Sequence, residues 1–207
     1  IGELTTTILE LAKTAEPTGP YGFAVFALML VLGLAGRRQA AEALLAELGA
    51  REGGPLVDFG FVTWSALAHG YAELLFEGNP GRSFRHLEIA ERFAPGLADN
   101  VVRVVLAYFR ATLYYDCGDF EAAVMHAKSV IDAKGADAVP YLRSWSEHVI
   151  GRVRLVTGKL DEALAIATSL AHSVDALFTQ RARSLEAQVL LAMGRLDEAA
   201  AKAETVI

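Results

Sequence analysis

The stretch from Leu155 to Leu170, LVTGKLDEALAIATSL, and the stretch from Leu190 to Ile207, LLAMGRLDEAAAKAETVI, follow one plan. In both, an apolar run ends at a glycine, and a short charged segment leads into an alanine-rich run. Glycine is common where one helix ends and the chain turns sharply, because it adopts the left-handed conformation without steric cost. Each stretch therefore predicts a helix, a tight turn at Gly158 or Gly194, and a second helix.

The same plan occurs three more times earlier in the chain. Aligned on their glycines, the five copies are 42, 40, 40 and 36 residues apart and turn at Gly36, Gly78, Gly118, Gly158 and Gly194. Self-similarity at a period of this size indicates stacked supersecondary units, each of which buries its apolar face against its neighbours. The chain is thus predicted to be a series of helix pairs.

The second helix of each predicted pair carries a stripe of small and apolar residues. Five residues after the glycines stand Ala41, Ser83, Ala123, Ala163 and Ala199. Further small or apolar side chains follow four and seven residues later, such as Ala167 and Leu170 in the fourth copy. These offsets lie on one helical face, so the stripe is expected to pack against neighbouring helices.

These patterns predict an all-α protein. We expect a lead helix within residues 1–16, a break at 16–20 and a repeat domain over residues 21–207. Its repeats are expected at about 21–49, 56–94, 97–134, 138–173 and 175–207. The last pair has no polar capping face, which solenoids need, so the sequence is interpreted as a fragment of a larger protein.

The copies resemble the tetratricopeptide-repeat (TPR) family, most closely in LVTGKLDEALAIA and LAMGRLDEAAAKA. The family's small close-packing residue, seven before the turn glycine, is matched by Ala111, Gly151 and Ala187, whereas Met29 and Tyr71 depart from it. Every interval exceeds the family period of about 34 residues. The resemblance covers about 21–207 and implies a right-handed superhelical solenoid of about five TPR-like antiparallel helix pairs.

Repeats of about 40 residues are similar to those in the sensor region of bacterial transcriptional activators of the maltose-regulator or LuxR type. Helical-repeat domains attached to bacterial signalling kinases are similar too. The nucleotide-binding, kinase and DNA-reading modules of those proteins have no counterpart in this sequence. The resemblance therefore implies a regulatory or signalling module.

Composition restricts partners and compartment. The chain has 19 Lys and Arg against 25 Asp and Glu, a net charge of −6, which argues against direct nucleic-acid binding. The uncharged stretch 21–35 is shorter than the roughly 20 residues of a membrane span, so it is interpreted as a buried helix and no membrane partner is expected. The single cysteine, Cys117, is expected to be a buried hydrophobe, which favours a cytoplasmic protein.

Catalytic and metal-binding patterns are missing from the sequence. Gly158 and Lys159 resemble the end of a phosphate-binding loop, but Val153 and Leu160 stand where glycine and Ser or Thr are needed. The five histidines show no ligand spacing, and one cysteine cannot build a structural zinc site. We therefore predict no enzymatic activity, no metal and no cofactor.

The TPR resemblance implies a concave surface lined by positions 13, 10, 6 and 3 before each turn glycine. In the last three copies these positions combine aromatic rings with arginine, histidine, amide and hydroxyl groups: Tyr108, Thr112, Tyr115, Trp145, His148, Arg152, Arg181, Ser184 and Gln188. Such a composition is typical of interaction hot spots. The alternative is that the aromatic rings fill the core between helices and the arginines are solvated.

Three functions remain open at this stage. The first is a non-catalytic scaffold whose groove binds a peptide or helix of a protein partner. The second is a small-molecule sensor domain of a bacterial transcriptional regulator, which predicts a closed pocket for a metabolite. The third, an enzyme on a helical scaffold, would need a cluster of perturbed ionisable groups in a cleft.

Overall fold

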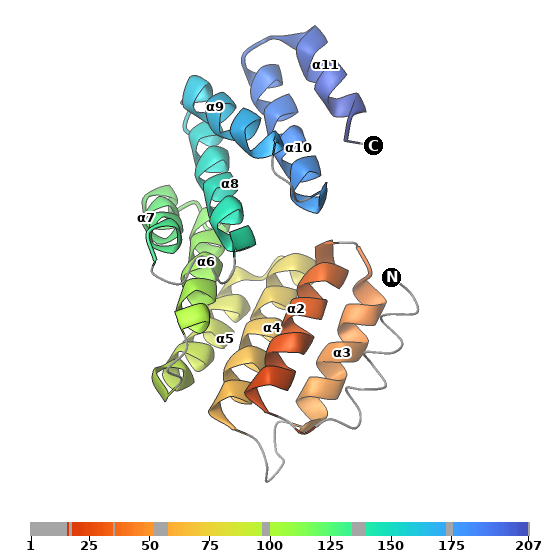
Figure 1. The fold of residues 1–207 in the computed structure, drawn as a ribbon, viewed down its shortest axis with the longest axis vertical. Helices are drawn as coiled ribbons and strands as arrows, with labels where there is room; N and C mark the ends of the chain where they lie inside the picture. Colours follow the sequence, from red (N-terminus) through yellow and green to blue (C-terminus); the bar gives the residue numbers. More distant parts are fainter. Residues whose placement is uncertain are drawn as a thin grey trace. The chain divides into compact units, whose positions relative to one another are not determined.

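The computed structural model of the chain describes residues 16, 18–34, 36–51, 58–96, 100–133, 140–172 and 176–206. Within these ranges the protein is all-α, with ten α-helices, one single-turn 3-10 helix and no strand (Figure 1). The chain forms two compact units, residues 1–102 and 103–207. The predicted lead helix, 1–16, lies outside the described residues except for Glu16.

The helices agree closely with the predicted pairs. The earlier elements are α2 (Gly19–Leu34), α3 (Arg38–Arg51), α4 (Phe59–Glu77), α5 (Pro80–Phe93) and the 3-10 helix η1 (Ala94–Gly96). The later ones are α6 (Asn100–Asp116), α7 (Phe120–Ile131), α8 (Pro140–Val156), α9 (Leu160–Ala171), α10 (Ala176–Ala192) and α11 (Leu196–Glu204).

The start of the first pair was predicted two residues too late. Gly19 and Pro20, which were expected in a break, begin α2. Proline is tolerated in the first helical turn, where the missing N–H would have had no intrahelical acceptor. The N–H of Gly19, the first residue of α2, donates to Oδ2 of Asp58, at 3.0 Å.

The five predicted turn glycines all adopt the left-handed conformation. Their φ values range from 58° to 80°, at Gly36, Gly78, Gly118, Gly158 and Gly194. At Gly158, the N–H of the glycine donates to the carbonyl of Leu155, and the N–H of Lys159 donates to that of Arg154. Equivalent pairs of bonds occur at Gly36, Gly118 and Gly194, and they satisfy carbonyls at the helix end. The predicted turns are confirmed.

The predicted stripe of the second helices is buried at its first position in every pair. Ala41, Ser83, Ala123 and Ala163 have no exposed surface, and Ala199 is 7% exposed. The hydroxyl of Ser83 donates to the carbonyl of Gly70 at 2.5 Å, so this polar residue is satisfied inside the core. Further along the last helix, Ala203 is exposed.

The apolar stretch at 21–35 belongs to the core of the first unit. Helix α2 packs against both α3 and α4 (Figure 1), and its side chains Val25, Met29 and Leu32 are buried. The ring centroid of Trp64 on α4 lies 4.9 Å from that of Phe23 and 5.3 Å from that of Phe26. No helix in the described part of the chain is both long and apolar enough to cross a membrane.

In the second unit, consecutive helices from α7 to α11 pack on one another. Helix α8 approaches its neighbours closely at Gly151. A Cβ atom added there would lie 2.9 Å from Cδ2 of Leu185 on α10 and 3.1 Å from Cγ2 of Ile166 on α9. The glycine thus permits a helix contact that a larger residue would obstruct.

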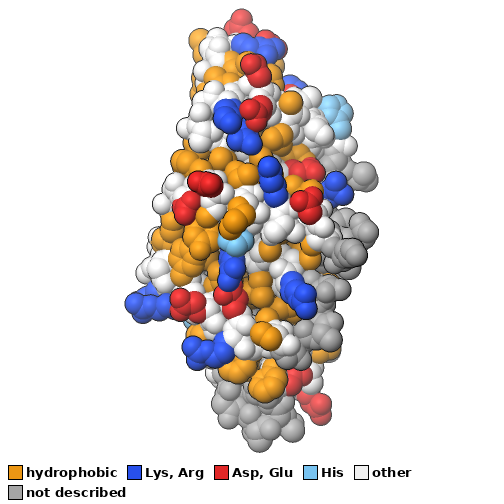
Figure 2. Space-filling model, turned by 90° about the vertical axis from the view of Figure 1, so that its left-hand side faces the viewer, with side chains coloured by type: hydrophobic (Ala, Val, Ile, Leu, Met, Phe, Trp, Pro, Cys, Tyr) orange, Lys and Arg blue, Asp and Glu red, His pale blue; other side chains and the backbone are white. Residues whose placement is uncertain are grey.

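The surface carries charges of both signs. On the face drawn in Figure 2, Lys and Arg side chains alternate with Asp and Glu side chains, and hydrophobic side chains lie between them. Among the residues described on this face, charges of one sign do not gather into a broad patch.

Candidate functional site

The second unit brings most of the predicted groove residues to a single cavity. This cavity of about 250 Å³ is lined by His148, Arg152, Arg181, Ser184, Leu185 and Gln188. The first two come from α8 and the other four from α10. Of the six, only Leu185 was not predicted as a groove residue, because an apolar side chain at this position indicates core in the sequence. In the structure it is 1% exposed.

Both arginines of the cavity lie over aromatic rings. The guanidinium carbon of Arg152 lies 4.0 Å from the centroid of the Tyr115 ring, and that of Arg181 lies 6.0 Å from the Trp145 ring. The rings of Tyr108 and Trp145 are 5.6 Å apart. A cation over an aromatic face is attracted by the ring's quadrupole, so these contacts orient the two guanidinium groups.

Burial divides the predicted groove residues into two groups. Tyr108 and Trp145 are each 8% exposed, so they fill the core between helices, as the alternative interpretation proposed. The hydroxyl of Thr112 donates to the carbonyl of Tyr108 within α6, at 3.2 Å. Arg181 and Gln188 are exposed, whereas Arg152 is partly buried. The arginines therefore line the cavity, and the aromatic residues support them from behind.

The cavity keeps His148 uncharged at neutral pH. Burial, together with the nearby charges of Arg152 and Arg181, lowers the pKa of His148 to about 4, although a hydrogen bond with the backbone of Arg181 opposes the shift. The pKa of Asp116 is raised by burial, and the charge of Arg152 counteracts this. At pH 7 the positive charge of the lining is thus carried by the two arginines.

Cys117 lies on the surface, so the prediction that it is buried was wrong. It follows the last residue of α6 and precedes the turn glycine, where the chain leaves the core. Partial desolvation and the carboxylates of Asp116 and Asp119 raise the pKa of its thiol. A raised pKa disfavours the thiolate that nucleophilic chemistry requires.

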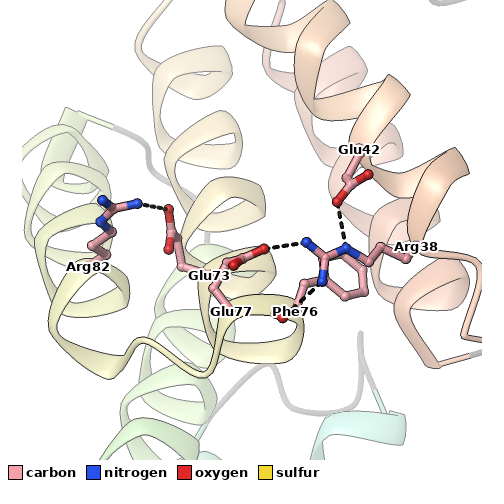
Figure 3. A network of polar contacts seen from close by, with 6 residues as sticks. All are labelled: Arg38, Glu42, Glu73, Phe76, Glu77 and Arg82. Carbon is pink, nitrogen blue, oxygen red and sulfur yellow. Dashed lines mark hydrogen bonds and ion pairs between the residues drawn. The ribbon is translucent and has the colours of Figure 1, made fainter.

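A second polar cluster, in the first unit, surrounds Arg38. Figure 3 shows Arg38 of α3 pointing toward Glu42 on its own helix and toward the end of α4. Its Nε donates to Glu42 at 2.6 Å, Nη1 donates to the carbonyl of Phe76 at 3.2 Å, and Nη2 bonds to Glu77. Because its donors are engaged by the protein, this arginine ties α3 to α4 and is a poor candidate for ligand binding.

No metal site is evident within the described ranges. There, no three His, Cys, Asp or Glu side chains lie close enough together to hold a metal ion. The imidazole rings of His69 on α4 and His86 on α5 are stacked, with centroids 5.6 Å apart. A pair alone provides fewer ligands than a zinc ion ordinarily takes from a protein.

The chemistry of the cavity follows from its donors. Guanidinium groups bind carboxylates and phosphates through two parallel hydrogen bonds, and the Gln188 amide and Ser184 hydroxyl add neutral donors. No carboxylate is among the described residues that line it. Comparisons of the chain with protein-family models, curated proteins and solved structures gave no match. The interpretation of the cavity therefore depends on its own residues.

Proposed function

We propose that this protein is a non-catalytic protein–protein interaction scaffold, built as a right-handed TPR-like solenoid and serving as a cytoplasmic regulatory or signalling module. Its cavity between α8 and α10 binds an anionic segment of a partner protein. The observation that carries this proposal is the pair of aromatic-supported arginines, Arg152 and Arg181, at the edge of one cavity.

The TPR-like arrangement is supported by the repetition of local detail. The left-handed turn recurs at all five glycines, and the hydrogen-bond pair that closes it recurs at four of them. A buried small residue follows each turn at the same distance. Repetition at this level is better explained by one supersecondary unit that recurs than by five unrelated helix pairs.

The two arginines favour an anionic ligand. Arg152 is partly buried against Tyr115, so much of the cost of desolvating its charge is met before the ligand arrives. A carboxylate that enters meets guanidinium groups already oriented by aromatic rings, and this preorganisation reduces the entropy lost on binding. An Asp or Glu side chain or a free C-terminus has the required chemistry.

The size and openness of the cavity favour a peptide over a free metabolite. At about 250 Å³ it is smaller than the roughly 300–1,000 Å³ of common small-molecule sites. Arg181 and Gln188 on its rim are exposed, so the cavity opens to solvent. A single acidic group fits inside while the rest of a peptide continues across the neighbouring helices.

The test compares acidic peptides with small anions as ligands of the 207-residue chain. Thermal unfolding is followed with pools of peptides that carry a free C-terminal carboxylate, with the same pools amidated, and with phosphate, sugar phosphates and dicarboxylic acids. A ligand at 100 times its dissociation constant adds about 2.7 kcal/mol to stability. We expect the acidic peptides to stabilise the protein and the amidated pools to stabilise it less.

Two neighbouring arginines on α8 provide the variant and its control. Arg152→Ala should weaken peptide binding by about 1 to 3 kcal/mol, because it removes a charge-assisted contact. Arg154→Ala should leave binding unchanged, since Arg154 does not line the cavity and pairs with Glu162 at 2.9 Å. If Arg152→Ala binds the peptides as tightly as the parent protein, the cavity is not the binding site. Stabilisation by small anions alone, abolished by Arg152→Ala, would favour the sensor function.

A further inference from the structure

The cavity between α8 and α10 places a titratable imidazole beside two fixed positive charges. His148 and Arg152 are four residues apart on α8, so they lie on one face of the helix, and Arg181 comes from α10. No carboxylate is among the described residues that line the cavity. The charge of His148 therefore depends on what occupies the cavity, because the charged side chains of the lining are all of one sign.

Other titratable groups near His148 lie outside the cavity lining. Tyr108 of α6 stays neutral because burial raises the pKa of its hydroxyl, and Asp116 at the end of α6 interacts electrostatically with Arg152. Glu147 pairs within α8 and lines a different cavity. Helices α7 and α9 also pack against α8, but none of their described residues lines the cavity between α8 and α10. The charged side chains that act on His148 are the two arginines.

A bound anion changes the electrostatic surroundings of His148. In the free protein, burial and then the charges of Arg152 and Arg181 lower the pKa of His148 to about 4. An anion held by the two guanidinium groups neutralises their charges and adds a negative charge inside a cavity of about 250 Å³. An opposite charge within about 4–6 Å commonly moves a pKa by about 1–3 pH units toward the charged form. The anion therefore favours the imidazolium form of His148.

We propose that anion binding in the cavity between α8 and α10 is coupled to the uptake of one proton from solvent by His148, so that the anionic segment of the partner binds more tightly as the pH falls. This inference rests on the proposed function, because it concerns the ligand of the same cavity. A charged imidazole donates from both ring nitrogens, so the proton adds a third cationic donor group to the lining. The cavity thereby becomes an anion site that responds to acidification.

The direction of the pH dependence follows from the order of the two pKa values. The complex binds the proton at a higher pH than the free protein does, so the affinity for the anion rises as the pH falls through the pKa of His148 in the complex. The rise is complete below the pKa of about 4 in the free protein. If the anion raises the pKa by about 2 pH units, the affinity should be about tenfold higher at pH 5 than at pH 7.5.

Sulfate is the probe, because it remains a dianion over this pH range, whereas carboxylates and phosphate take up protons themselves. NMR titration of the histidine ring protons of the 207-residue chain measures the pKa of His148 in sodium sulfate and in sodium chloride of equal ionic strength. The His148 resonance is identified by its loss in His148→Gln. We expect sulfate to raise this pKa by about 1 pH unit or more, and the dissociation constant for sulfate to be about tenfold lower at pH 5 than at pH 7.5.

Two variants identify the group that takes up the proton. His148→Gln removes the imidazole and should bind sulfate with nearly the same affinity at both pH values. Asp116→Asn is the matched control, because it removes the other titratable group beside Arg152, and it should keep the pH dependence of the parent protein. Far-ultraviolet circular dichroism at both pH values confirms that each variant folds, and the NMR titration of the parent protein requires no variant to be stable.

The outcomes separate this inference from the proposed function. If sulfate binds but leaves the pKa of His148 unchanged, or if His148→Gln keeps the pH dependence, the coupling is wrong and the anion-binding cavity stands. PH dependence that is lost in Asp116→Asn and kept in His148→Gln would assign the proton to Asp116 instead. An absence of sulfate binding at both pH values would also overturn the coupling, and the proposed function would then be judged by the peptide pools alone.

Discussion

Replacing Gly151 by alanine should destabilise the second unit, although glycine to alanine inside a helix ordinarily stabilises a protein by about 0.5–1 kcal/mol. The reason is the space around this residue on α8. The added methyl carbon would lie 2.9 Å from Cδ2 of Leu185 and 3.1 Å from Cγ2 of Ile166. Leu185 is 1% exposed and packs in a cluster with Ala163, Ala167 and Val189, which restricts the displacement of its side chain.

The expected magnitude is the difference between these two effects. Overpacking of a well-packed core costs about 1–3 kcal/mol. Subtracting the gain in helix propensity leaves a net loss of about 1 kcal/mol for Gly151→Ala. Gly151→Leu introduces three more carbons at the same point, and we expect a loss of about 2–3 kcal/mol. For a unit of about 100 residues, each kcal/mol lowers the melting temperature by about 4 °C or more.

Thermal unfolding followed by far-ultraviolet circular dichroism measures both variants. The matched control is Gly49→Ala on α3, where an added Cβ would meet no atom within 4 Å. That change should raise stability by about 0.5–1 kcal/mol. If Gly151→Ala is as stable as the parent or more stable, α8 does not approach α9 and α10 as closely as described.

Three further changes test the turns, the caps and the buried histidine. Gly158→Ala should cost about 1–2 kcal/mol in urea unfolding, because the φ of 76° is unfavourable for a residue with a Cβ. Asp58→Ala should cost about 1–2 kcal/mol, since Oδ1 of Asp58 accepts from the N–H of Phe61 at 2.6 Å and Oδ2 accepts from the N–H of Gly19 at 3.0 Å. Asp58→Asn should restore only part of the loss, because its single amide oxygen can replace one of the two acceptors. Because the pKa of His148 falls from 6.5 to about 4 on folding, its contribution to stability is complete above pH 6.5 and is lost as the pH falls toward 4. At pH 5 the loss is about 1–2 kcal/mol, and urea titrations of His148→Gln should lack this part of the pH dependence.

The helices and turns follow from the sequence because their causes are local. A left-handed turn needs glycine at one position, so Gly118 and Gly158 mark the ends of α6 and α8 without reference to the rest of the chain. A stripe at offsets of four and three predicts a face that packs on neighbouring helices, and Ala163 and Ala167 on this face of α9 are buried. The first turn of α2 was misplaced because Asp58, 39 residues away, accepts the hydrogen bond from Gly19.

The candidate sites depend on tertiary structure, because they are defined by which helices meet. Spacing placed Arg152 and Arg181 on first helices, but only the packing of α8 against α10 brings them to one cavity and leaves Tyr108 and Trp145 in the core behind it. Helix α10 packs over Ala163 and Ala167 on α9, whereas Ala203, at the position of α11 that corresponds to Ala167, is exposed. Local sequence determines which faces are apolar. Contacts between distant segments decide which of those faces are buried and which remain available to a partner.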